Sequence, residues 1–307
     1  MTRTDGILAV KGHGTRNDFV LLDDRDGALD LTPELVRALA DRRGGVGGDG
    51  VIRLVAADRL ADGALGGDAR WFMDYRNADG SLAQMCGNGV RVFATWLERL
   101  GLWEPAAGEL VVGTRAGARR VRREDGPDGG PWYVVDMGTW FLPGGDAAVA
   151  AGGDVEVSVG GLAVARPALR VDVGNPHAVL AVSSPDELAA ADLTHAPGVT
   201  PAGADGQNVE LVLPLGERIA PDGTAVGALR MRVHERGAGE TASCGTGACA
   251  AALAVRAWLG DGAPDAWSVE VPGGLLRVTA LPDGHVELAG PAVLVADVVV
   301  DPAALAG

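Results

Sequence analysis

The sequence predicts an α+β fold of two pseudo-symmetric homologous lobes, each a mostly antiparallel β-sheet wrapped around a central helix. The strings MCGNG at 85–89 and SCGTG at 243–247 share C-G-x-G at an offset of 158 residues, which indicates an internal repeat. The same offset pairs Asn17 with Asn175 and Met73 with Met231. Short valine-rich or alternating segments, typical of strands, lie between these points.

Each element of this fold has a local signal. Strands are expected at DFVLLD, GVIRLV, ARWFMDYR and ELVVG in the first half, and at NVELVL, LRMRVHE, LRVTAL and HVELAG in the second. Turn-forming residues at 77–80 and 282–284 separate such strands. After each C-G-x-G, apolar residues recur at helical spacing, in VRVFATWLERLG and in ACAAALAVRAWLG, and each stretch ends in glycine.

Length and composition limit the classes of protein to consider. A chain of 307 residues can form two compact halves, and 47% hydrophobic with 22% charged residues is a globular composition, which argues against disorder. The net charge of −15 repels phosphate backbones, so nucleic acid is not an expected partner. No signal-peptide pattern and no apolar run of membrane-spanning length is found, so we expect a cytoplasmic protein without membrane contact.

The reactive side chains argue against a cofactor or a metal. Cys86, Cys244 and Cys249 are too few for a disulfide framework, and none forms a C-x-x-C pair of the kind that binds zinc. Lys11 is the only lysine available for a Schiff base with pyridoxal phosphate, and it lies in the expected strand ILAVKG without a supporting motif. We therefore expect neither a cofactor nor a metal.

Two cysteines at helix starts suggest proton-transfer chemistry. The helix macrodipole and the unpaired N–H groups of the first turn favour a thiolate at Cys86 and at Cys244. The N–H groups of Gly87-Asn88 and Gly245-Thr246 can bind a carboxylate, which stabilises the charge that develops as an α-proton leaves. One thiolate can accept this proton while the other thiol delivers a proton to the opposite face. Cys249, on the apolar face of the second helix, is expected to be a small buried hydrophobe.

Six segments together resemble the diaminopimelate epimerase family, and the resemblance covers essentially the whole chain. They are GHGTRNDFVLLD, GVGGDG, YRNADGSLAQMCGNGVR, VGNPHAV, GQNVELV and HERGAGETASCGTGACAA, in the family's order. The resemblance implies cofactor-independent conversion of LL-diaminopimelate to meso-diaminopimelate, a step of lysine biosynthesis whose product also serves peptidoglycan. The implied partner is this small-molecule substrate.

The resemblance also implies roles for individual residues. Cys86 and Cys244 would be the two proton-transfer groups. His177 and Glu235 are similar to residues that adjust the ionisation of the two thiols. The substrate would be bound by Asn17, Asn77, Asn175, Asn208, Glu235 and Arg236, with Gly87, Asn88, Gly245 and Thr246 at the reacting carboxylate. The chain departs from many relatives at Arg16, where they carry glycine, and at Gly50, where some carry glutamine, so a substrate contact at position 50 is in doubt.

The expected domains follow from the repeat and the resemblance. The N-terminal lobe comprises residues 1–134 with 292–307, because the last strand of the family returns to the first lobe, and the C-terminal lobe comprises residues 135–291. We expect the active site in the cleft between them, where small-molecule sites are common. Whether the chain acts as a monomer or a homodimer stays open at this stage.

Parts of the sequence also fit other functions. A proline racemase or hydroxyproline epimerase also uses two cysteines, but those enzymes usually carry histidine after the first Cys-Gly, where this chain has Asn88. The phenazine-biosynthesis isomerases share the fold and lack the cysteine pair. A binding protein without catalysis, and a redox protein that joins Cys86 to Cys244, are alternatives from other classes. The glycines of 44–50 lack the Gly-Lys-Ser/Thr ending of a phosphate-binding loop.

Overall fold

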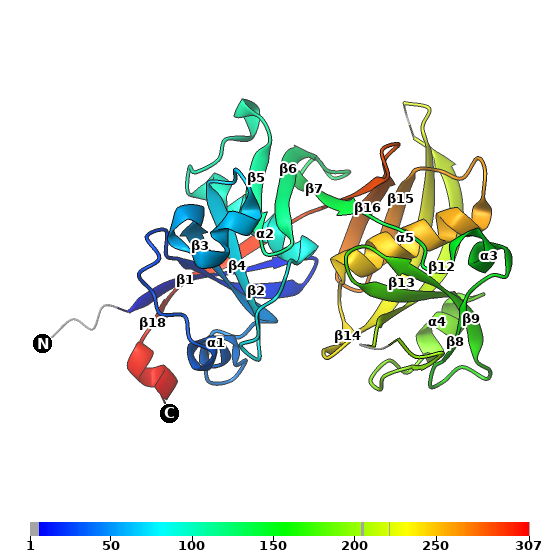
Figure 1. Cartoon of the computed structure of the whole chain (residues 1–307), viewed down its shortest axis with the longest axis horizontal. Coiled ribbons are helices and arrows are strands. Elements are labelled where there is room, and N and C mark those ends of the chain that lie inside the picture. Colours follow the sequence, from blue (N-terminus) through cyan, green and yellow to red (C-terminus); the bar gives the residue numbers. More distant parts are fainter. Residues whose placement is uncertain (1–5, 204–205, 221, 307) are drawn as a thin grey trace, which may run out of the picture. The chain divides into compact units, whose positions relative to one another are not determined.

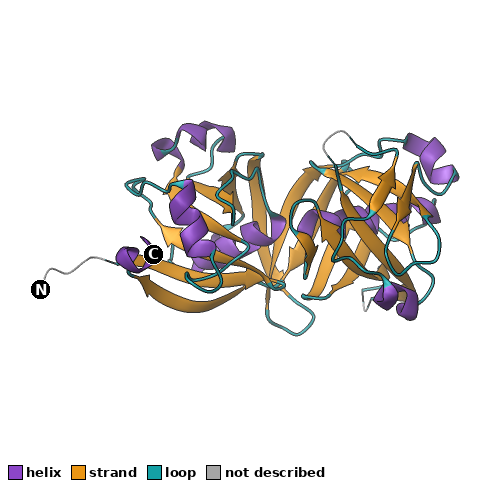
Figure 2. Ribbon diagram, turned by 90° about the horizontal axis from the view of Figure 1, so that it is seen from below, coloured by secondary structure: helices purple, strands orange, loops and turns teal. Residues whose placement is uncertain are grey.

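The computed structural model describes residues 6–203, 206–220 and 222–306, and it confirms the predicted α+β class. Strands predominate, and the helices are few and mostly short (Figures 1 and 2). The chain divides into two compact units. Unit 1 comprises the described residues up to Val135 together with those from Gly290 onward, and unit 2 comprises Asp136–Ala289.

Unit 1 is built from strands at both ends of the chain. Its helices are α1 (Pro33–Ala40) and α2 (Gly87–Arg99), with 3₁₀ turns η1 (Ala57–Arg59), η2 (Ala61–Gly66), η3 (Pro105–Ala107) and η4 (Pro302–Ala306). Its strands are β1 (Ile7–Gly14), β2 (Asn17–Asp23), β3 (Gly50–Ala56), β4 (Trp71–Asn77), β5 (Leu110–Thr114), β6 (Gly117–Asp125), the first part of β7 (Pro131–Thr139), and β18 (Val293–Val300). Strand β18 pairs with β1, so the chain returns to its first strand.

Unit 2 contains the remaining elements. Its helices are α3 (Gly145–Ala150), α4 (Pro185–Ala190) and α5 (Gly245–Leu259). Its strands are β8 (Val155–Ser158), β9 (Arg166–Asp172), β10 (Pro176–Ala181), β11 (Gly198–Thr200), β12 (Asn208–Ile219), β13 (Ala225–Glu235), β14 (Gly239–Thr241), β15 (Ala266–Val271), β16 (Gly274–Ala280) and β17 (His285–Gly290).

The two units repeat one order of strand pairing. In unit 1, β2–β3 is parallel, β3–β4 antiparallel, β4–β5 parallel and β5–β6 antiparallel. In unit 2, β10–β12, β12–β13, β13–β15 and β15–β16 follow the same sequence of directions. This shared topology is what the repeat of 158 residues predicts, and it places the two C-G-x-G strings at equivalent points of the two units.

Each unit packs its strands around one long helix. Helix α2 packs against β1, β2, β4 and β18, and helix α5 packs against β9, β10, β12, β13, β15 and β16. Five alanines of α5, at 248, 250, 251, 252 and 254, are fully buried, and small side chains allow the surrounding strands to approach closely. Cys249 is also fully buried on this helix, which confirms its predicted place in the core.

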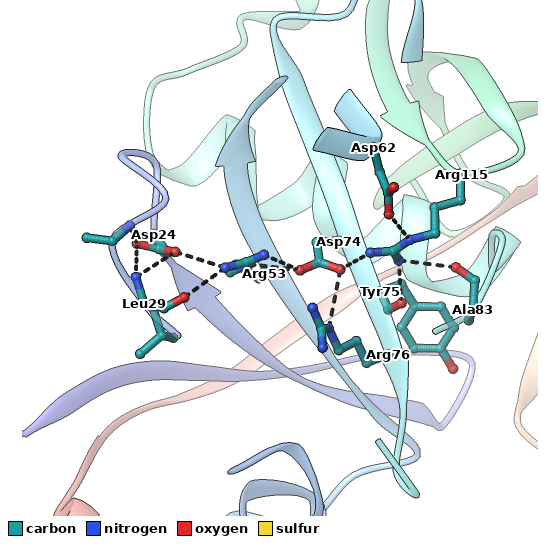
Figure 3. Close-up of polar contacts among 10 residues, drawn as sticks. Asp24, Leu29, Arg53, Asp62, Asp74, Tyr75, Arg76, Ala83 and Arg115 are labelled. Carbon is teal, nitrogen blue, oxygen red and sulfur yellow. Dashed lines mark hydrogen bonds and ion pairs between the residues drawn. The ribbon is translucent and has the colours of Figure 1, made fainter. Parts of the chain in front are cut away.

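A buried ion network braces the strands of unit 1 next to α2. Asp74 on β4 is fully buried and accepts hydrogen bonds from Arg53 at 2.8 Å and from Arg115 (Figure 3). Although burial acts in the opposite direction, Arg115 and Arg53 hold the pKa of Asp74 below its usual range. Arg115 also donates to the carbonyl oxygens of Tyr75 at 3.0 Å and Ala83 at 3.4 Å. The network therefore fixes the start of the segment that leads from β4 to α2.

Candidate functional site

Cys86 occupies the N-cap of helix α2. Its backbone is extended, with φ −145° and ψ 117°, and its thiol sulfur accepts a hydrogen bond from the Gly89 N–H at 3.5 Å. The Cys86 carbonyl accepts the first helical bond, from Val90 N at 2.8 Å. This is the geometry of a Ser or Asp cap with sulfur as the acceptor, and it places the sulfur at the positive end of the helix.

The side chain of Asn17, at the start of β2, faces this thiol. Its Oδ1 lies 3.6 Å from Cys86 Sγ and accepts a hydrogen bond from Asn88 Nδ2 at 3.2 Å. Its Nδ2 donates to Asp49 Oδ2 at 2.7 Å, and this fixes which end of the amide faces the sulfur. Asn88 is itself fully buried, and Arg91 donates to its Oδ1 at 2.5 Å. Unit 1 thus brings together three of the predicted site residues.

Asn77 is the last residue of β4 and precedes Cys86 in the chain by nine residues. Its side chain donates to Ser81 Oγ at 3.0 Å and its backbone N–H to Ser81 O at 3.0 Å, so it closes the turn before Cys86. Gly50 pairs with Asn77 across β3 and β4. A Cβ at Gly50 would stand 2.4 Å from the carbonyl oxygen of Arg76, so the backbone leaves no room for the glutamine of some relatives.

Cys244 occupies the equivalent N-cap of helix α5, with φ −114° and ψ 118°. Its sulfur accepts from the Gly247 N–H at 3.4 Å and lies 3.5 Å from Thr246 Oγ1. Cys244 is only 5% exposed, and burial, followed by the nearby carboxylates of Glu235 and Glu210, raises the pKa of its thiol. The first-turn Gly247 N–H and the Thr246 hydroxyl lower this pKa, as a helix start predicts, but desolvation and the two carboxyl groups outweigh them.

The carboxylate of Glu235, at the end of β13, belongs to the surroundings of Cys244. Burial raises the pKa of Glu235, and Thr241 Oγ1 donates a hydrogen bond to its Oε1. The neighbouring Arg236 N–H donates to Asn208 Oδ1 at 2.9 Å. Asn208 thereby holds the backbone of the strand end that carries both charged residues.

His177 and Asn175 form a further pair in unit 2. His177 on β10 is fully buried, with Nε2 3.1 Å from Asn175 Oδ1 and Nδ1 2.7 Å from Glu210 Oε1. Glu210, on β12, was not among the residues predicted from the sequence. The sequence does contain a signal for Glu210, namely a charged residue within the apolar strand NVELVL. Such a residue must be paired if the strand is buried. Burial raises the pKa of Glu210, and His177 opposes this shift.

Other properties of the described residues bear on function. Lys11, the only lysine, forms an ion pair with Asp18 at 2.6 Å. No group of three or more His, Cys, Asp or Glu side chains that could hold a metal ion is found in the part of the chain that the structure describes. Within the same residues, no helix is long and apolar enough to cross a membrane. A surface pocket of about 910 Å³ on unit 1, lined by residues 25–26, 56–61, 63–64 and 67–71, contains none of the predicted site residues.

Solved structures of known proteins share this fold. A phenazine biosynthesis protein of the PhzF family from Bacillus anthracis matches with a TM-score of 0.66 and 15% identity, covering 96% of this chain and 98% of that one. A hydroxyproline epimerase from Agrobacterium vitis matches with a TM-score of 0.57 and 14% identity, covering 99% of this chain and 95% of that one. At such identities the likeness concerns the fold alone.

Sequence relatives are more informative. A diaminopimelate epimerase from Streptomyces coelicolor is 48% identical over 310 aligned positions, which cover 98% of each chain. One from Thermobifida fusca is 47% identical over 295 positions, covering 94% of this chain and 95% of the relative. The family described as diaminopimelate epimerase matches residues 9–141 and 169–295, which include both cysteine helix starts. On these matches, the chain belongs to the diaminopimelate epimerase family.

Proposed function

We propose that this chain converts LL-diaminopimelate to meso-diaminopimelate by moving a proton between two cysteines, without a cofactor. The observation that carries the proposal is the equivalence of Cys86 and Cys244. Each is the N-cap of the long helix of its unit, and the sulfur of each accepts a hydrogen bond from the N–H three residues later. A reaction that inverts one carbon needs two such groups, one for each face of that carbon.

We propose one role for each thiol in this direction. Cys86 as thiolate takes the α-proton, and the electron pair of the broken C–H bond spreads onto the adjoining carboxylate. Cys244, whose pKa is raised, holds its proton at rest and delivers it to the opposite face. The turnover leaves Cys86 as thiol and Cys244 as thiolate, which are the states required for the reverse reaction.

The first turns of the two helices support the charge that forms during this step. We propose that the N–H groups of Gly87-Asn88 and Gly245-Thr246 donate to the reacting carboxylate, since the positive end of a helix dipole favours an anion. One substrate molecule must then reach both thiols.

The second amino-acid end of diaminopimelate needs both donors and acceptors. Arg236 supplies a cation for its carboxylate, and Glu235 an anion for an ammonium. Asparagine side chains can take either role because they both donate and accept. The amides proposed for this binding are those of Asn17, Asn77, Asn175 and Asn208, and His177 is proposed to adjust thiol ionisation together with Glu235.

The test is substrate inversion in deuterated water. Reduced protein is incubated with LL-diaminopimelate and no added cofactor, and the meso isomer and its α-deuterium are followed by mass spectrometry and chiral chromatography. We expect meso product carrying one solvent deuterium with the wild type and with Cys249→Ala, and a loss of roughly 10²-fold or more in kcat with Cys86→Ala or Cys244→Ala. An unchanged rate in either of these two variants would overturn the mechanism.

The rival substrates belong in the same assay. If the wild type leaves diaminopimelate unchanged and inverts L-proline or hydroxyproline, the chain is a proline racemase or hydroxyproline epimerase. A reductant titration addresses the redox alternative, because a disulfide between Cys86 and Cys244 removes both the acid and the base. We expect activity to rise with reductant, and turnover of dithiols instead would support a redox protein.

We also propose that the enzyme acts in the cytoplasm as a homodimer. None of the three cysteines forms a disulfide bond, which suits a reducing compartment. Leu8 on β1 pairs with Val299 on β18, and each is 71% exposed, so unit 1 presents an apolar surface patch. Sedimentation velocity should give the mass of two chains for the wild type and of one for Val299→Glu. A wild-type monomer at assay concentrations contradicts the dimer.

A further inference from the structure

Glu210 is a buried carboxyl group for which the mechanism above proposes no part in substrate binding. It lies on β12 with no exposed surface, although β12 presents apolar neighbours on both sides of it, Val209 and Leu211. Its Oε1 lies 2.7 Å from His177 Nδ1, and its Oε2 has no hydrogen-bond partner among the described residues. Leaving a carboxyl oxygen buried without a partner costs free energy, so the group is retained for something other than stability.

The hydrogen bonds of His177 limit where protons can lie. Asn175 Oδ1 can only accept, so the bond of 3.1 Å requires a proton on His177 Nε2. One further proton is then shared between His177 Nδ1 and Glu210, as carboxylate with imidazolium or as carboxylic acid with imidazole. Both states are neutral overall, and both keep Nε2–H directed at Asn175.

Glu210 also touches the helix start that carries Cys244. A Cβ at Gly247, in the first turn of α5, would stand 2.7 Å from Glu210 Oε1. The glycine of the C-G-x-G string is therefore what allows the carboxyl to lie under this turn. One carboxyl group thus adjoins the reacting thiol on one side and the Asn175–His177 pair on the other.

We propose that Glu210 is a positioning residue for substrate binding, acting through His177. The hydrogen bond between Glu210 and Nδ1 keeps the imidazole in the form that has a proton on Nε2. This Nε2–H donates to Asn175 Oδ1, so the amide oxygen already has a partner. The Nδ2 of Asn175 is then left to donate to a carboxylate of the substrate. Without Glu210, a neutral His177 can carry its proton on Nδ1, and the Asn175 amide is free to turn its oxygen toward the substrate. This inference rests on the proposed function of Asn175 in binding diaminopimelate.

The kinetic test uses two variants at position 210 and one matched control. Methionine has the length of glutamate and cannot replace its hydrogen bond, whereas glutamine keeps a polar atom within reach of His177 Nδ1. For Glu210→Met we expect KM for LL-diaminopimelate to rise roughly tenfold, as for the loss of one hydrogen bond to a charged group, with a smaller change in kcat. Glu210→Gln should recover most of the affinity. Glu217→Met, an exposed position on the same strand, should change neither constant.

A spectroscopic test separates this inference from the proposed substrate. Nitrogen NMR of imidazole-labelled protein reports the protonation of each ring nitrogen, and His177→Gln identifies the signal among the five histidines. We expect a protonated Nε2 in the wild type and in Glu210→Gln, and a shift toward Nδ1–H in Glu210→Met. Unchanged His177 signals in Glu210→Met overturn the inference whatever the substrate is. If the signals shift as expected but the wild type does not epimerise diaminopimelate, the proposed function fails and the positioning role of Glu210 stands.

Misfolding is distinguished by the pattern of the two constants. A variant that only destabilises the protein lowers the amount of active enzyme, which reduces apparent kcat and leaves KM unchanged. A fall in kcat alone in both Glu210→Met and Glu210→Gln, without a change in KM, would therefore overturn the positioning role.

Discussion

Glu210 Oε1 lies so close to the backbone of Gly247 that position 247 has no room for a side chain. A Cβ at this position would stand 2.7 Å from the oxygen. At the equivalent glycine of unit 1, Gly89, a Cβ would instead stand 3.2 Å from the Cδ1 methyl of Ile52. The first turns of α2 and α5 thus repeat one backbone but rest on different chemistry, a hydrocarbon in one unit and a carboxyl group in the other.

This difference predicts that adding a methyl group lowers the reaction rate more at Gly247 than at Gly89. Gly247→Ala must displace Glu210 or Cys244, whose Sγ would lie 3.3 Å from the new atom, and a catalytic group displaced by about 1 Å can lose roughly 100-fold in rate. Gly89→Ala needs only a small movement of Ile52, so we expect a loss of less than about tenfold. Steady-state kinetics of the two variants, with melting temperatures as the folding control, provides the comparison. A larger loss for Gly89→Ala would contradict it.

The carboxylate of Glu235 affects how kcat/KM depends on pH. Cys244 delivers its proton only while it is a thiol, so the alkaline limb of kcat/KM follows its pKa in the free enzyme. Burial and Glu235 raise that pKa, and removing the negative charge lowers it. The alkaline limb of Glu235→Gln should therefore lie at lower pH than that of the wild type. The exposed Glu217→Gln is the control, and a limb that stays in place or moves to higher pH would show that Glu235 does not act on this thiol.

The ion network of Figure 3 predicts a large loss of stability from one substitution. Asp74→Ala leaves the buried guanidinium groups of Arg53 and Arg115 without the carboxylate that they share, at a cost of about 3 kcal/mol in the free energy of unfolding. Asp62 also pairs with Arg115 but its side chain is 39% exposed, so Asp62→Ala should cost about 1 kcal/mol or less. Urea unfolding followed by tryptophan fluorescence measures both, and equal costs would mean that burial of the network is irrelevant.

The ionisation of the Tyr133 phenol is shifted far enough to be measured. Burial, together with the hydrogen bond that it donates to Glu98 at 2.6 Å, raises the pKa of Tyr133 to about 12. Since an unfolded tyrosine titrates near about 10, the stabilisation by this group is complete below that pH and is lost as pH rises toward about 12.

A phenolate absorbance titration checks this ionisation directly. The chain has two tyrosines, so Tyr75→Phe leaves Tyr133 as the only one. We expect a midpoint near the raised pKa and a lower midpoint after Glu98→Gln, because the neighbouring carboxylate is gone. A midpoint of about 10 in the folded protein would refute the buried hydrogen bond.

The local parts of the fold were predictable from the sequence. The helix starts at Cys86 and Cys244 and the glycines near both helix ends are encoded within a few residues, and the repeated string marks them twice. The strands followed from their alternating or apolar patterns. These signals are short-range, so a single sequence carries them.

The electrostatics of the site were not predictable in the same way. The raised pKa of Cys244 comes from burial and from Glu235 and Glu210, which tertiary structure brings to it from β13 and β12. The helix-start argument accounts only for the N–H of the first turn, which lowers this pKa, and it does not include the larger opposing effects of burial and of the two carboxyl groups. Arg53 and Glu210 each stand within an apolar strand, which signals a buried partner but does not identify Asp74 or His177 as that partner.

The pairing of β18 with β1 has a consequence for how the chain is made. Synthesis proceeds from the N-terminus, and domains generally fold as units while it continues. All the strands of unit 2 precede β18 in the chain, so unit 2 can complete its sheet without β18. Strand β1 can pair with β2 at once, but its other edge has to wait for a strand nearly three hundred residues later. A released chain that ends before Val293 should therefore hold a protease-resistant unit 2 and an unfinished unit 1, in which the β18-facing edge of β1 is open to chaperones.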